Sequence, residues 1–457
     1  MSLRPVSTVL CVGLSVAALC QGPFAKEVKS LKDLGLRSMG AYGLLEELTT
    51  KVGNRVDGSA NAAKAVDWGK ATMERLGFQN VHLVACIVPH WVRGDRETLE
   101  LLGANGDATP LTCCALGGSV GTAPAGVTGE VIEVRSLAEA AQLGEKAKGK
   151  ILFFNRPMDP TLTRAFAAYG GAVDQRVGGA AAAAKVGAIA AIVRSMTLDT
   201  DDVPHTGVMM YQKGVPQIPT AALSILAANR LSEELKSRGA VSVRLTLNCE
   251  KLPDALSANV VGEIVGAEKP NEVIVMGGHL DSWDKGTGAH DDGAGIAQSL
   301  EALHLIKELG WKPKRTIRVV LFMDEEQSGS GSTAYAAFVK HSQEKAYAAV
   351  ESDSGGFAPR AIGSSLSKDQ LKKLSKWVQA LKAFEVMELT SGSGGGADVG
   401  KLGHLGAILF GLEPESQRYF DYHHSANDTL DKVNRRELEL GALSIALLSW
   451  LLSEEGV

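Results

Sequence analysis

The sequence has no long run of basic residues and, beyond its N-terminus, no long run of apolar ones. Its 457 residues carry a formal net charge of −5. Because phosphate backbones are bound by clustered Lys and Arg, nucleic acid is not an expected partner. The longest later apolar stretch, GALSIALLSWLL near the C-terminus, is too short to span a bilayer. We therefore expect no membrane span and a buried C-terminal helix.

Several familiar site motifs are also missing. There are six cysteines and no C-x-x-C pair, so no zinc ribbon is indicated. The chain has no H-E-x-x-H helix and no G-x-S-x-G elbow that leads from a buried strand into a helix. The Gly-rich segment 391–400 lacks the Lys of a phosphate-binding loop. One-zinc proteases, serine hydrolases of the elbow type and P-loop enzymes are thereby disfavoured.

The N-terminus has the pattern of an export signal. In residues 1–25 a single positive residue, Arg4, precedes an apolar run from about Val9 to Leu19, as in a secretory signal peptide. Cleavage after Ala25 fits this pattern. Lipoprotein anchoring at Cys20 is less favoured, because Leu19 is not the small residue expected there. We expect a secreted or periplasmic protein.

Export permits disulfide bonds, but the sequence leaves their pairing open. The cysteines beyond the predicted signal peptide are Cys86, Cys113, Cys114 and Cys249.

The rest of the chain has an ordinary globular composition, with 45% hydrophobic and 22% charged residues. Its length predicts two domains, or one domain with an insertion. Residues 26–110 are expected to form the first part of the main domain. Within it, residues from about 36 to 110 read as helix, helix, strand, strand, with Ser59 capping a helix that stops at Gly77. Residues 111–253 are richer in Gly and Ala and read as an insert. Residues 254–457 read as the second part of the main domain.

Buried strands alternate with helices from residue 254 onward. NEVIVMGGHLD, RTIRVVLF, YAAVE and LGAILFGLE are nearly continuous hydrophobic runs, typical of parallel strands covered on both faces. We therefore predict an α/β fold with a mixed, mostly parallel sheet and helices on both faces. In such sheets ligands bind at the carboxyl ends of the strands.

Acidic and imidazole side chains follow these strands at that edge. Each one has a simpler explanation, such as a loop histidine, a solvated Glu pair or an Asp-Asp-Gly turn. Together they require many coincidences, and carboxylates so close repel unless a cation lies among them. We predict paired divalent ions, for which zinc suits the donor types. The residues are His279, Asp281, Asp291, Asp292, Glu325, Glu326, Asp353, His423 and His424.

These motifs carry a family resemblance. GGHLDSW…GAHDDGAGIA, MDEEQSGSGSTAY, ESDSGG and YHHSANDT resemble the co-catalytic zinc exopeptidases, which include bacterial leucyl aminopeptidases and glutamate carboxypeptidases. The stretch from VRSMTLDTDD to PQIPTAALS is similar to the protease-associated insert of the carboxypeptidase Q (plasma glutamate carboxypeptidase) branch. The resemblance covers nearly the whole chain after the predicted signal peptide. It implies the zinc exopeptidase fold, a protease-associated-like insert and two Zn²⁺ per chain.

The resemblance also implies a role for each residue of the motifs. It assigns His279 and Asp353 to one zinc, Glu326 and His424 to the other, and Asp291 to both. His424 is preferred to His423 because it directly precedes SANDT, which leaves a one-residue alternative.

Further roles follow from the same resemblance. Glu325 is expected to be the general base, which takes a proton from the attacking water and passes it to the leaving amine. Asp281 is expected to orient the imidazole of His279. The Asp291–Asp292 peptide bond is expected to be cis.

Three neighbouring residues complete the predictions for the site. His290 has no assigned role and is expected to be an ordinary loop residue. Asp428 is expected to brace the turn of the last ligand. His423 is expected to point away from His424 into the substrate cleft, because adjacent residues of an extended segment face opposite sides.

We therefore expect a secreted di-zinc metallo-exopeptidase that hydrolyses dipeptides or short peptides with free termini. One alternative is an aminopeptidase that acts on longer peptides, which the ligands do not distinguish. Another is a non-catalytic receptor-like binding module, like the transferrin-receptor ectodomains, which have lost ligands. Glutaminyl cyclases use a related fold with one zinc and would not need the insert. The insert is expected to be a lid or a pairing surface, which allows a homodimer.

Overall fold

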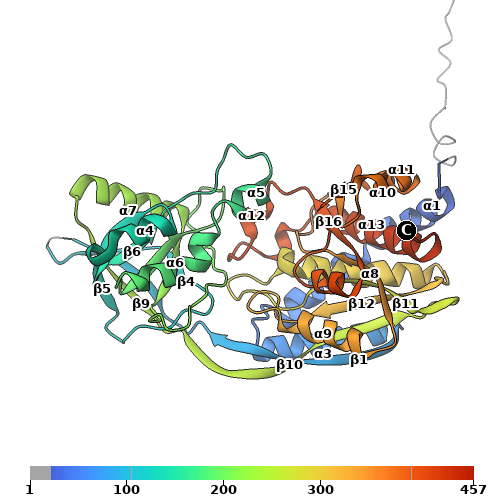
Figure 1. The fold of residues 1–457 in the computed structure, drawn as a ribbon, viewed down its shortest axis with the longest axis horizontal. Helices are drawn as coiled ribbons and strands as arrows, with labels where there is room; N and C mark the ends of the chain where they lie inside the picture. Colours follow the sequence, from blue (N-terminus) through green and yellow to red (C-terminus); the bar gives the residue numbers. More distant parts are fainter. Residues whose placement is uncertain (1–21, 104, 393) are drawn as a thin grey trace, which may run out of the picture.

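The computed structural model describes residues 22–103, 105–392 and 394–457, which form two bodies side by side (Figure 1). The second body comprises residues 97–247, and the main body comprises the described residues before and after it. Each body is built on one eight-stranded sheet. The predicted signal peptide lies outside the described residues, apart from residues 22–25, and so does Cys20.

The main sheet is mixed, with a parallel centre. Strands β12, β11, β13 and β16 run parallel to one another, whereas β1, β10 and β14 join through antiparallel pairs. In spatial order the strands are β1 (Gln79–Val92), β10 (Glu250–Ile264), β12 (Arg315–Phe322), β11 (Lys269–His279), β13 (Lys345–Glu351), β16 (Ile408–Pro414), β14 (Pro359–Ser364) and β15 (Glu388–Ser391).

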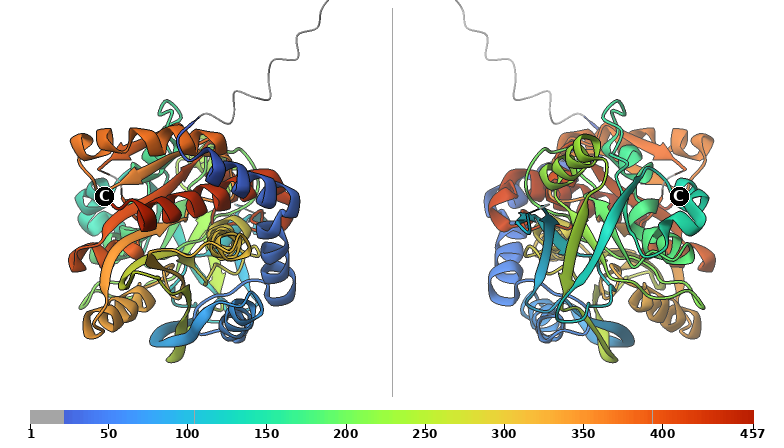
Figure 2. Two further views of the ribbon diagram at one scale, coloured as in Figure 1. Left: turned by 90° about the vertical axis from the view of Figure 1, so that its right-hand side faces the viewer. Right: turned by 90° about the vertical axis from the view of Figure 1, so that its left-hand side faces the viewer.

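Helices cover both faces of the main sheet, as the continuous hydrophobic strands predicted. Alternate residues of β11 enter two different cores: Ile274 and Met276 pack with α8, whereas Val273 and Val275 pack with α9. Figure 2 shows the helices around the sheet from the end of the molecule. The helices are α1 (Ala25–Ser38), α2 (Gly40–Glu47), α3 (Ala60–Arg75), α8 (Ala294–Glu308), α9 (Ser330–His341), α10 (Lys368–Lys373), α11 (Ser375–Leu381), α12 (Tyr419–Tyr422) and α13 (Arg435–Glu454).

The helix that follows Gly53 shows how the sequence sets its own boundaries. The Ser59 hydroxyl accepts a hydrogen bond from the backbone N–H of Ala62 and so caps α3. The chain leaves the helix through Gly77, whose φ of +72° is accessible to glycine at little cost. Both ends agree with the sequence prediction.

The second body has a parallel centre flanked by antiparallel strands. In spatial order its strands are β3 (Ala108–Leu111), β2 (Glu97–Leu102), β9 (Ser242–Leu247), β5 (Val127–Val134), β6 (Ile151–Phe154), β7 (Ala190–Arg194), β8 (Thr220–Leu223) and β4 (Cys113–Ala115). Its helices are α4 (Leu137–Leu143), α5 (Ala165–Gly170), α6 (Asp174–Lys185) and α7 (Ile225–Arg238). The second sheet therefore begins earlier than the predicted insert, which we started at residue 111. Strand β2 pairs with the distant β9, a partner that a local reading cannot supply.

The two bodies are connected by a long antiparallel ribbon of β1 and β10, which runs along the lower side of Figure 1. The cysteines Cys86, Cys113, Cys114 and Cys249 are all free. Within the described part of the chain, no helix combines the length and the apolar character needed to cross a membrane.

Candidate metal centre

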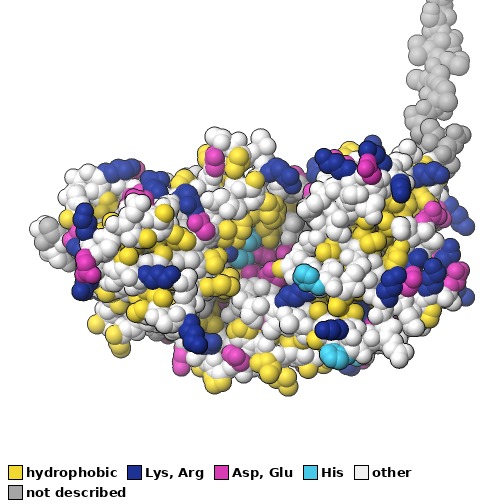
Figure 3. Space-filling model, viewed as in Figure 1, with side chains coloured by type: hydrophobic (Ala, Val, Ile, Leu, Met, Phe, Trp, Pro, Cys, Tyr) yellow, Lys and Arg dark blue, Asp and Glu magenta, His cyan; other side chains and the backbone are white. Residues whose placement is uncertain are grey.

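The carboxyl ends of β11, β12 and β13 meet at one edge of the main sheet, as predicted. His279 is the last residue of β11, Glu325 and Glu326 follow β12, and Asp353 follows β13. The hollow between the two bodies exposes carboxylate and imidazole side chains at its base (Figure 3). The prediction that these side chains meet at one edge of the sheet is confirmed.

Asp291 lies at the centre of this group, between two sets of donors. Its Oδ1 is 3.2 Å from Nε2 of His279, and its Oδ2 is 3.1 Å from Nε2 of His424. The remaining members are close on either side. Nε2 of His279 is 3.6 Å from Asp353, and Nε2 of His424 is 3.0 Å from Glu326.

The loop that carries Asp291 is held rigidly by neighbouring carboxylates. Asp428 accepts hydrogen bonds from the N–H groups of His290 and Asp291, at 2.6 and 3.1 Å. Asp292 accepts from the N–H groups of His279 and Gly295, both at 3.0 Å. The Asp291–Asp292 bond is cis, as the resemblance implied. The carboxylate of Asp428 therefore braces the Asp291 loop, whereas within its own turn Asp428 contributes its backbone N–H, which donates to the backbone oxygen of Ser425 at 3.2 Å.

Asp281 is placed next to His279, but its carboxylate serves mainly another element. The Nδ1 of His279 is 3.1 Å from the backbone oxygen of Asp281 and 3.7 Å from its carboxylate. That carboxylate accepts hydrogen bonds from the N–H groups of Asp324, Glu325 and Glu326, at 2.8, 3.2 and 3.1 Å. Asp281 thus orients His279 through its carbonyl and fixes the acidic turn after β12 through its side chain.

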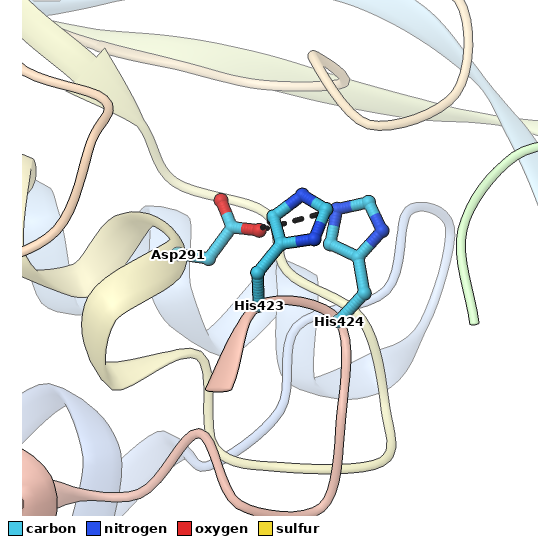
Figure 4. A group of neighbouring side chains, drawn as sticks. All are labelled: Asp291, His423 and His424. Carbon is cyan, nitrogen blue, oxygen red and sulfur yellow. Dashed lines mark ion pairs between the residues drawn. The ribbon is translucent and has the colours of Figure 1, made fainter. Parts of the chain in front are cut away.

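The expected opposite orientation of His423 and His424 is wrong. Their rings stack, with centroids 3.5 Å apart, and both approach Asp291 (Figure 4). The alternation of side chains requires an extended backbone. His424 instead has a φ of +60°, in the left-handed region, and this turn brings both rings to the same side. His423 is the more distant of the two, with its Nε2 3.7 Å from Asp291.

His290 is not the ordinary loop residue that we expected. Its ring is fully buried and stacks between Phe357 and Tyr422, with centroids 4.3 and 5.3 Å away. Its Nδ1 accepts a hydrogen bond from the N–H of Gly356. Burial lowers the pKa of this imidazole to about 4, so it is a neutral packing element under the Asp291 loop.

Two further residues support the site and were not singled out from the sequence. Arg55 is completely buried and donates to the backbone oxygens of Leu280, Thr287 and Gly288 at 2.6–3.0 Å, so its charge lies beneath the acidic loop. Trp283 donates from Nε1 to Oε2 of Glu326 at 2.6 Å. Arg55 lies outside the motifs of the sequence analysis. Trp283 ends the motif GGHLDSW, but its role depends on a contact with Glu326, 43 residues away.

The pKa values of Asp291 and Glu325 are shifted in opposite directions. Burial opposes ionisation of Asp291, but His279 and His424 hold its pKa well below the usual range. Burial raises the pKa of Glu325 well above the usual range, and the charges of Asp353 and Glu326 add to this effect against that of His279. Glu325 therefore has a high proton affinity beside an ionised carboxylate.

The donor set fits a divalent metal ion. Three overlapping groups of potential ligands each lie within 4.8 Å: Asp291, His423 and His424; His279, Asp292 and Asp353; and His279, Asp291 and Glu326. Among the described residues, Oε1 of Glu326 is buried without a hydrogen-bond partner, and Oδ2 of Asp291 meets no donor in hydrogen-bond geometry. Buried oxygens of this kind need compensation. Imidazole nitrogen and carboxylate oxygen are ligands that suit zinc.

A cleft of about 700 Å³ opens beside Asp353. Arg164 and Phe166 of the second body line one side of it, and Glu388, Glu413 and Arg360 of the main body line the other. Gln417 donates to the backbone oxygen of Thr163 at 2.7 Å and joins the two sides. The site therefore adjoins a space large enough for a small peptide.

Comparison with known proteins agrees with this architecture. The model of peptidase family M28 matches residues 259–447. Carboxypeptidase Q of Bos taurus is 35% identical over 436 residues, which cover 95% of this chain and 89% of that protein. The human carboxypeptidase Q is 34% identical over the same shares of the two chains.

Solved structures show the same fold over both bodies. The peptidase M28 precursor of Shewanella amazonensis has a TM-score of 0.89 and 35% identity, covering 94% of this chain and 97% of that one. A zinc aminopeptidase of Bacillus subtilis has a TM-score of 0.64 at 19% identity, covering 90% and 94%, and shares the fold. The chain belongs to peptidase family M28 and, within that family, groups with carboxypeptidase Q.

Proposed function

We propose that this chain is a secreted exopeptidase that uses two zinc ions to hydrolyse dipeptides or short peptides. The observation that carries the proposal is the position of Asp291. Each of its carboxylate oxygens faces a separate set of donors, His279 on one side and His424 on the other. One carboxylate that serves two donor sets is the arrangement expected of a bridging ligand in a two-metal hydrolase.

The remaining ligands follow from proximity to these two imidazoles. We assign Asp353 to the ion at His279, and Glu326 to the ion at His424. The distances of 3.6 Å for Nε2 of His279 to Asp353 and 3.0 Å for Nε2 of His424 to Glu326 support this division. His424 is preferred to His423 because it contacts both Asp291 and Glu326, whereas the ring of His423 lies farther from Asp291.

Glu325 is proposed as the general base. When bound, zinc ions lower the pKa of a coordinated water and polarise the scissile carbonyl. Glu325 takes a proton from the attacking water and later donates it to the leaving amine. Two features support this role: its raised pKa favours acceptance of a proton, and its backbone is fixed by Asp281. Glu326 can bind metal while its neighbour remains available for proton transfer.

The preference for short peptides rests on the relatives and the cleft. The similar proteins are named carboxypeptidase Q, and the cleft beside Asp353 is closed on one side by the second body. A more remote relative of the same fold is described as a zinc aminopeptidase, so cleavage from the amino end of longer peptides is the competing specificity.

A panel of peptides tests this proposal. We expect zinc-loaded protein to hydrolyse unmodified dipeptides, and to lose at least ~10²-fold in kcat/KM when the metal is chelated. N-acetylated dipeptides, dipeptide amides and pentapeptides serve as matched substrates. Equal rates on pentapeptides would favour the aminopeptidase reading. Failure to hydrolyse any peptide, with no zinc retained, would overturn the proposal in favour of a binding module.

Secretion and self-association are separate parts of the proposal. The pattern of residues 1–25 supports export, and fractionation of cells that express the full chain tests it. Retention in the cytoplasm without processing would contradict it. A homodimer is proposed from the resemblance alone, and light scattering of the purified protein gives its mass directly.

A further inference from the structure

The proposed ligands differ in which body supports them. His279 is held entirely by the main body: its N–H donates to Asp292, and its Nδ1 lies 3.1 Å from the backbone oxygen of Asp281. Of the ligands assigned to the other ion, His424 contacts the second body directly, and Glu326 reaches it through Trp283. Three contacts produce this asymmetry.

The first contact is a backbone pairing between Thr206 and His424. The N–H of Thr206 donates to the backbone oxygen of His424 at 2.9 Å, and Nδ1 of His424 lies 3.3 Å from the backbone oxygen of Thr206. An imidazole that binds metal through Nε2 carries its proton on Nδ1 and needs an acceptor there. Thr206 supplies that acceptor from the second body; the other second-body group at this nitrogen, the guanidinium of Arg176 at 3.4 Å, can only donate. The adjacent His205 ring also lies 2.6 Å from the backbone oxygen of His423.

The second contact explains why a glycine follows Thr206. A Cβ at Gly207 would lie 2.6 Å from Nδ1 of His424 and 2.6 Å from the guanidinium carbon of Arg176. Real Cβ atoms do not approach so closely, so any side chain here must displace the imidazole or the guanidinium. Because Gly207 has no side chain, the backbone of the second body can lie directly against the imidazole of His424.

The third contact reaches Glu326 through Trp283. The indole N–H donates to Oε2 of Glu326, while the ring lies against the second body. A Cβ at Gly117 would be 1.8 Å from the Trp283 ring, and Trp91 meets the same ring edge-on at 6.2 Å. Trp283 is 4% exposed. Its orientation, and with it the hydrogen bond to Glu326, depends on the second body being in place.

We propose that the second body completes one half of the metal centre. Thr206, Gly207 and Trp283 act as positioning residues for the ion held by His424 and Glu326, whereas the ion at His279 and Asp353 depends on the main body alone. The inference rests on the proposed two-zinc function. According to this inference, both metal ions bind only when the second body is docked against the main body.

Metal content of the full-length protein tests the inference. Gly207→Ala should lower zinc from about two to about one per chain after dialysis, because the new methyl group displaces His424. Gly214→Ala is the matched control: it also replaces a second-body glycine of positive φ, +81° against +131°, but at a position with no atom within 4 Å of the new Cβ. The control should keep both ions.

Trp283→Phe provides a second, gentler variant, because it keeps an aromatic ring and removes the N–H. It should weaken the affinity of one zinc about 10–100-fold, as loss of a hydrogen bond to a ligand does elsewhere, and leave the other unchanged in a chelator titration. A general loss of structure would instead lower both affinities together.

The outcomes separate this inference from the proposed function. Wild-type protein that binds no zinc would overturn the proposed function. Wild-type protein with two ions, together with both variants retaining two ions at unchanged affinity, would overturn only the inference. Equal loss of both ions in folded Gly207→Ala would also overturn it, because the asymmetry would be absent.

Discussion

The two sheets of this molecule share an architecture but differ at the edge where ligands bind. Both have four parallel strands at the centre. In the second sheet the polar residues at the carboxyl ends of β6 and β7 satisfy one another. Asn155 donates to Glu133 at 2.8 Å and accepts from Arg194 at 3.2 Å. At the edge of the main sheet the described residues leave Oδ2 of Asp291 and Oε1 of Glu326 without hydrogen-bond partners.

The main sheet instead gathers carboxylates that lack sufficient cationic partners among the described residues. Asp291 and Glu326 keep buried oxygens without hydrogen bonds among the described residues. The guanidinium of Arg55 donates to backbone oxygens below the loop, and that of Arg176 lies 3.4 Å from Nδ1 of His424. Both sheets have the same kind of edge, but in the part of the chain that the structure describes only the main sheet has buried carboxylate oxygens there without hydrogen-bond partners. These oxygens, and not the fold, mark the edge of the main sheet as a candidate site.

The largest expected effect comes from Glu325→Gln. Loss of the proton-transfer group should lower kcat by at least ~10²-fold, while zinc content stays unchanged because Glu326 is the proposed ligand. Steady-state kinetics on a dipeptide and metal analysis of the same sample measure both. Zinc loss in Glu325→Gln and none in Glu326→Gln would mean that the two roles are exchanged.

Glu133→Gln is the corresponding change at the edge of the second sheet. Glu133 accepts hydrogen bonds from Asn155 and Ser232, at 2.8 and 2.7 Å, and takes no part in the proposed chemistry. We expect kcat to remain within about 2-fold of wild type, since surface and scaffold changes away from the site act mainly on stability. A large loss of activity here would weaken the contrast between the two edges.

Part of this site could be predicted from the sequence. His279, Glu325, Glu326 and Asp353 were placed correctly because each ends a strongly hydrophobic strand, and parallel strands bring their carboxyl ends to one edge. Each hydrophobic run and the polar residue after it can be recognised from adjacent residues, and the parallel arrangement of the strands then brings these polar residues together. The α/β class and the capped helix α3 were predictable for the same reason.

What the sequence could not show depends on contacts between distant segments or on a single backbone angle. Thr206 contacts His424 from the second body, and Trp283 meets Glu326 across 43 residues of the chain. The orientation of His423 depends on the left-handed backbone of His424, which no flanking glycine announces. Strand β2 was placed in the wrong body because its partner β9 lies far along the chain.

Substitution of each member of the histidine pair sharpens the comparison within the main site. His424→Ala should lower zinc content from about two towards one, because it removes a proposed strong ligand. His423→Ala should keep both ions and lower kcat, since its ring borders the site without approaching Glu326 as His424 does. Because the two rings stack on each other, both variants lose the same ring contact. Each variant is therefore a control for the other. Zinc loss in His423→Ala with full retention in His424→Ala would shift the ligand by one residue.

The last prediction concerns stability and a buried carboxyl group that lies outside either edge. Glu439 of α13 is completely buried, accepts one hydrogen bond from the N–H of Ala41 at 3.1 Å, and has a second oxygen without a partner among the described residues. Within the described ranges, no imidazole is grouped with it in a potential metal site. Burial, together with the charge of Glu301, raises its pKa to about 8. It therefore tests whether an unpartnered carboxyl group alone indicates a metal centre.

Glu439 should behave as a proton-binding packing residue, and the sign of its pH dependence follows from linkage. Its folded pKa of about 8 exceeds the unfolded value of about 4.3. The folded state thus binds more protons than the unfolded state between these values, and this group's contribution to stability is lost as pH rises from about 4.3 to about 8. Glu439→Gln, which cannot ionise, should gain stability relative to wild type by at least about 1.4 kcal/mol between pH 5 and pH 8.5, the free energy of one pKa unit. Urea unfolding of both proteins at the two pH values, with zinc present throughout, measures the difference. If the stability difference between the two proteins is the same at pH 5 and pH 8.5, Glu439 is already ionised at pH 5. If added zinc stabilises wild type but not Glu439→Gln, a cation binds at Glu439, and the contrast with Asp291 is lost.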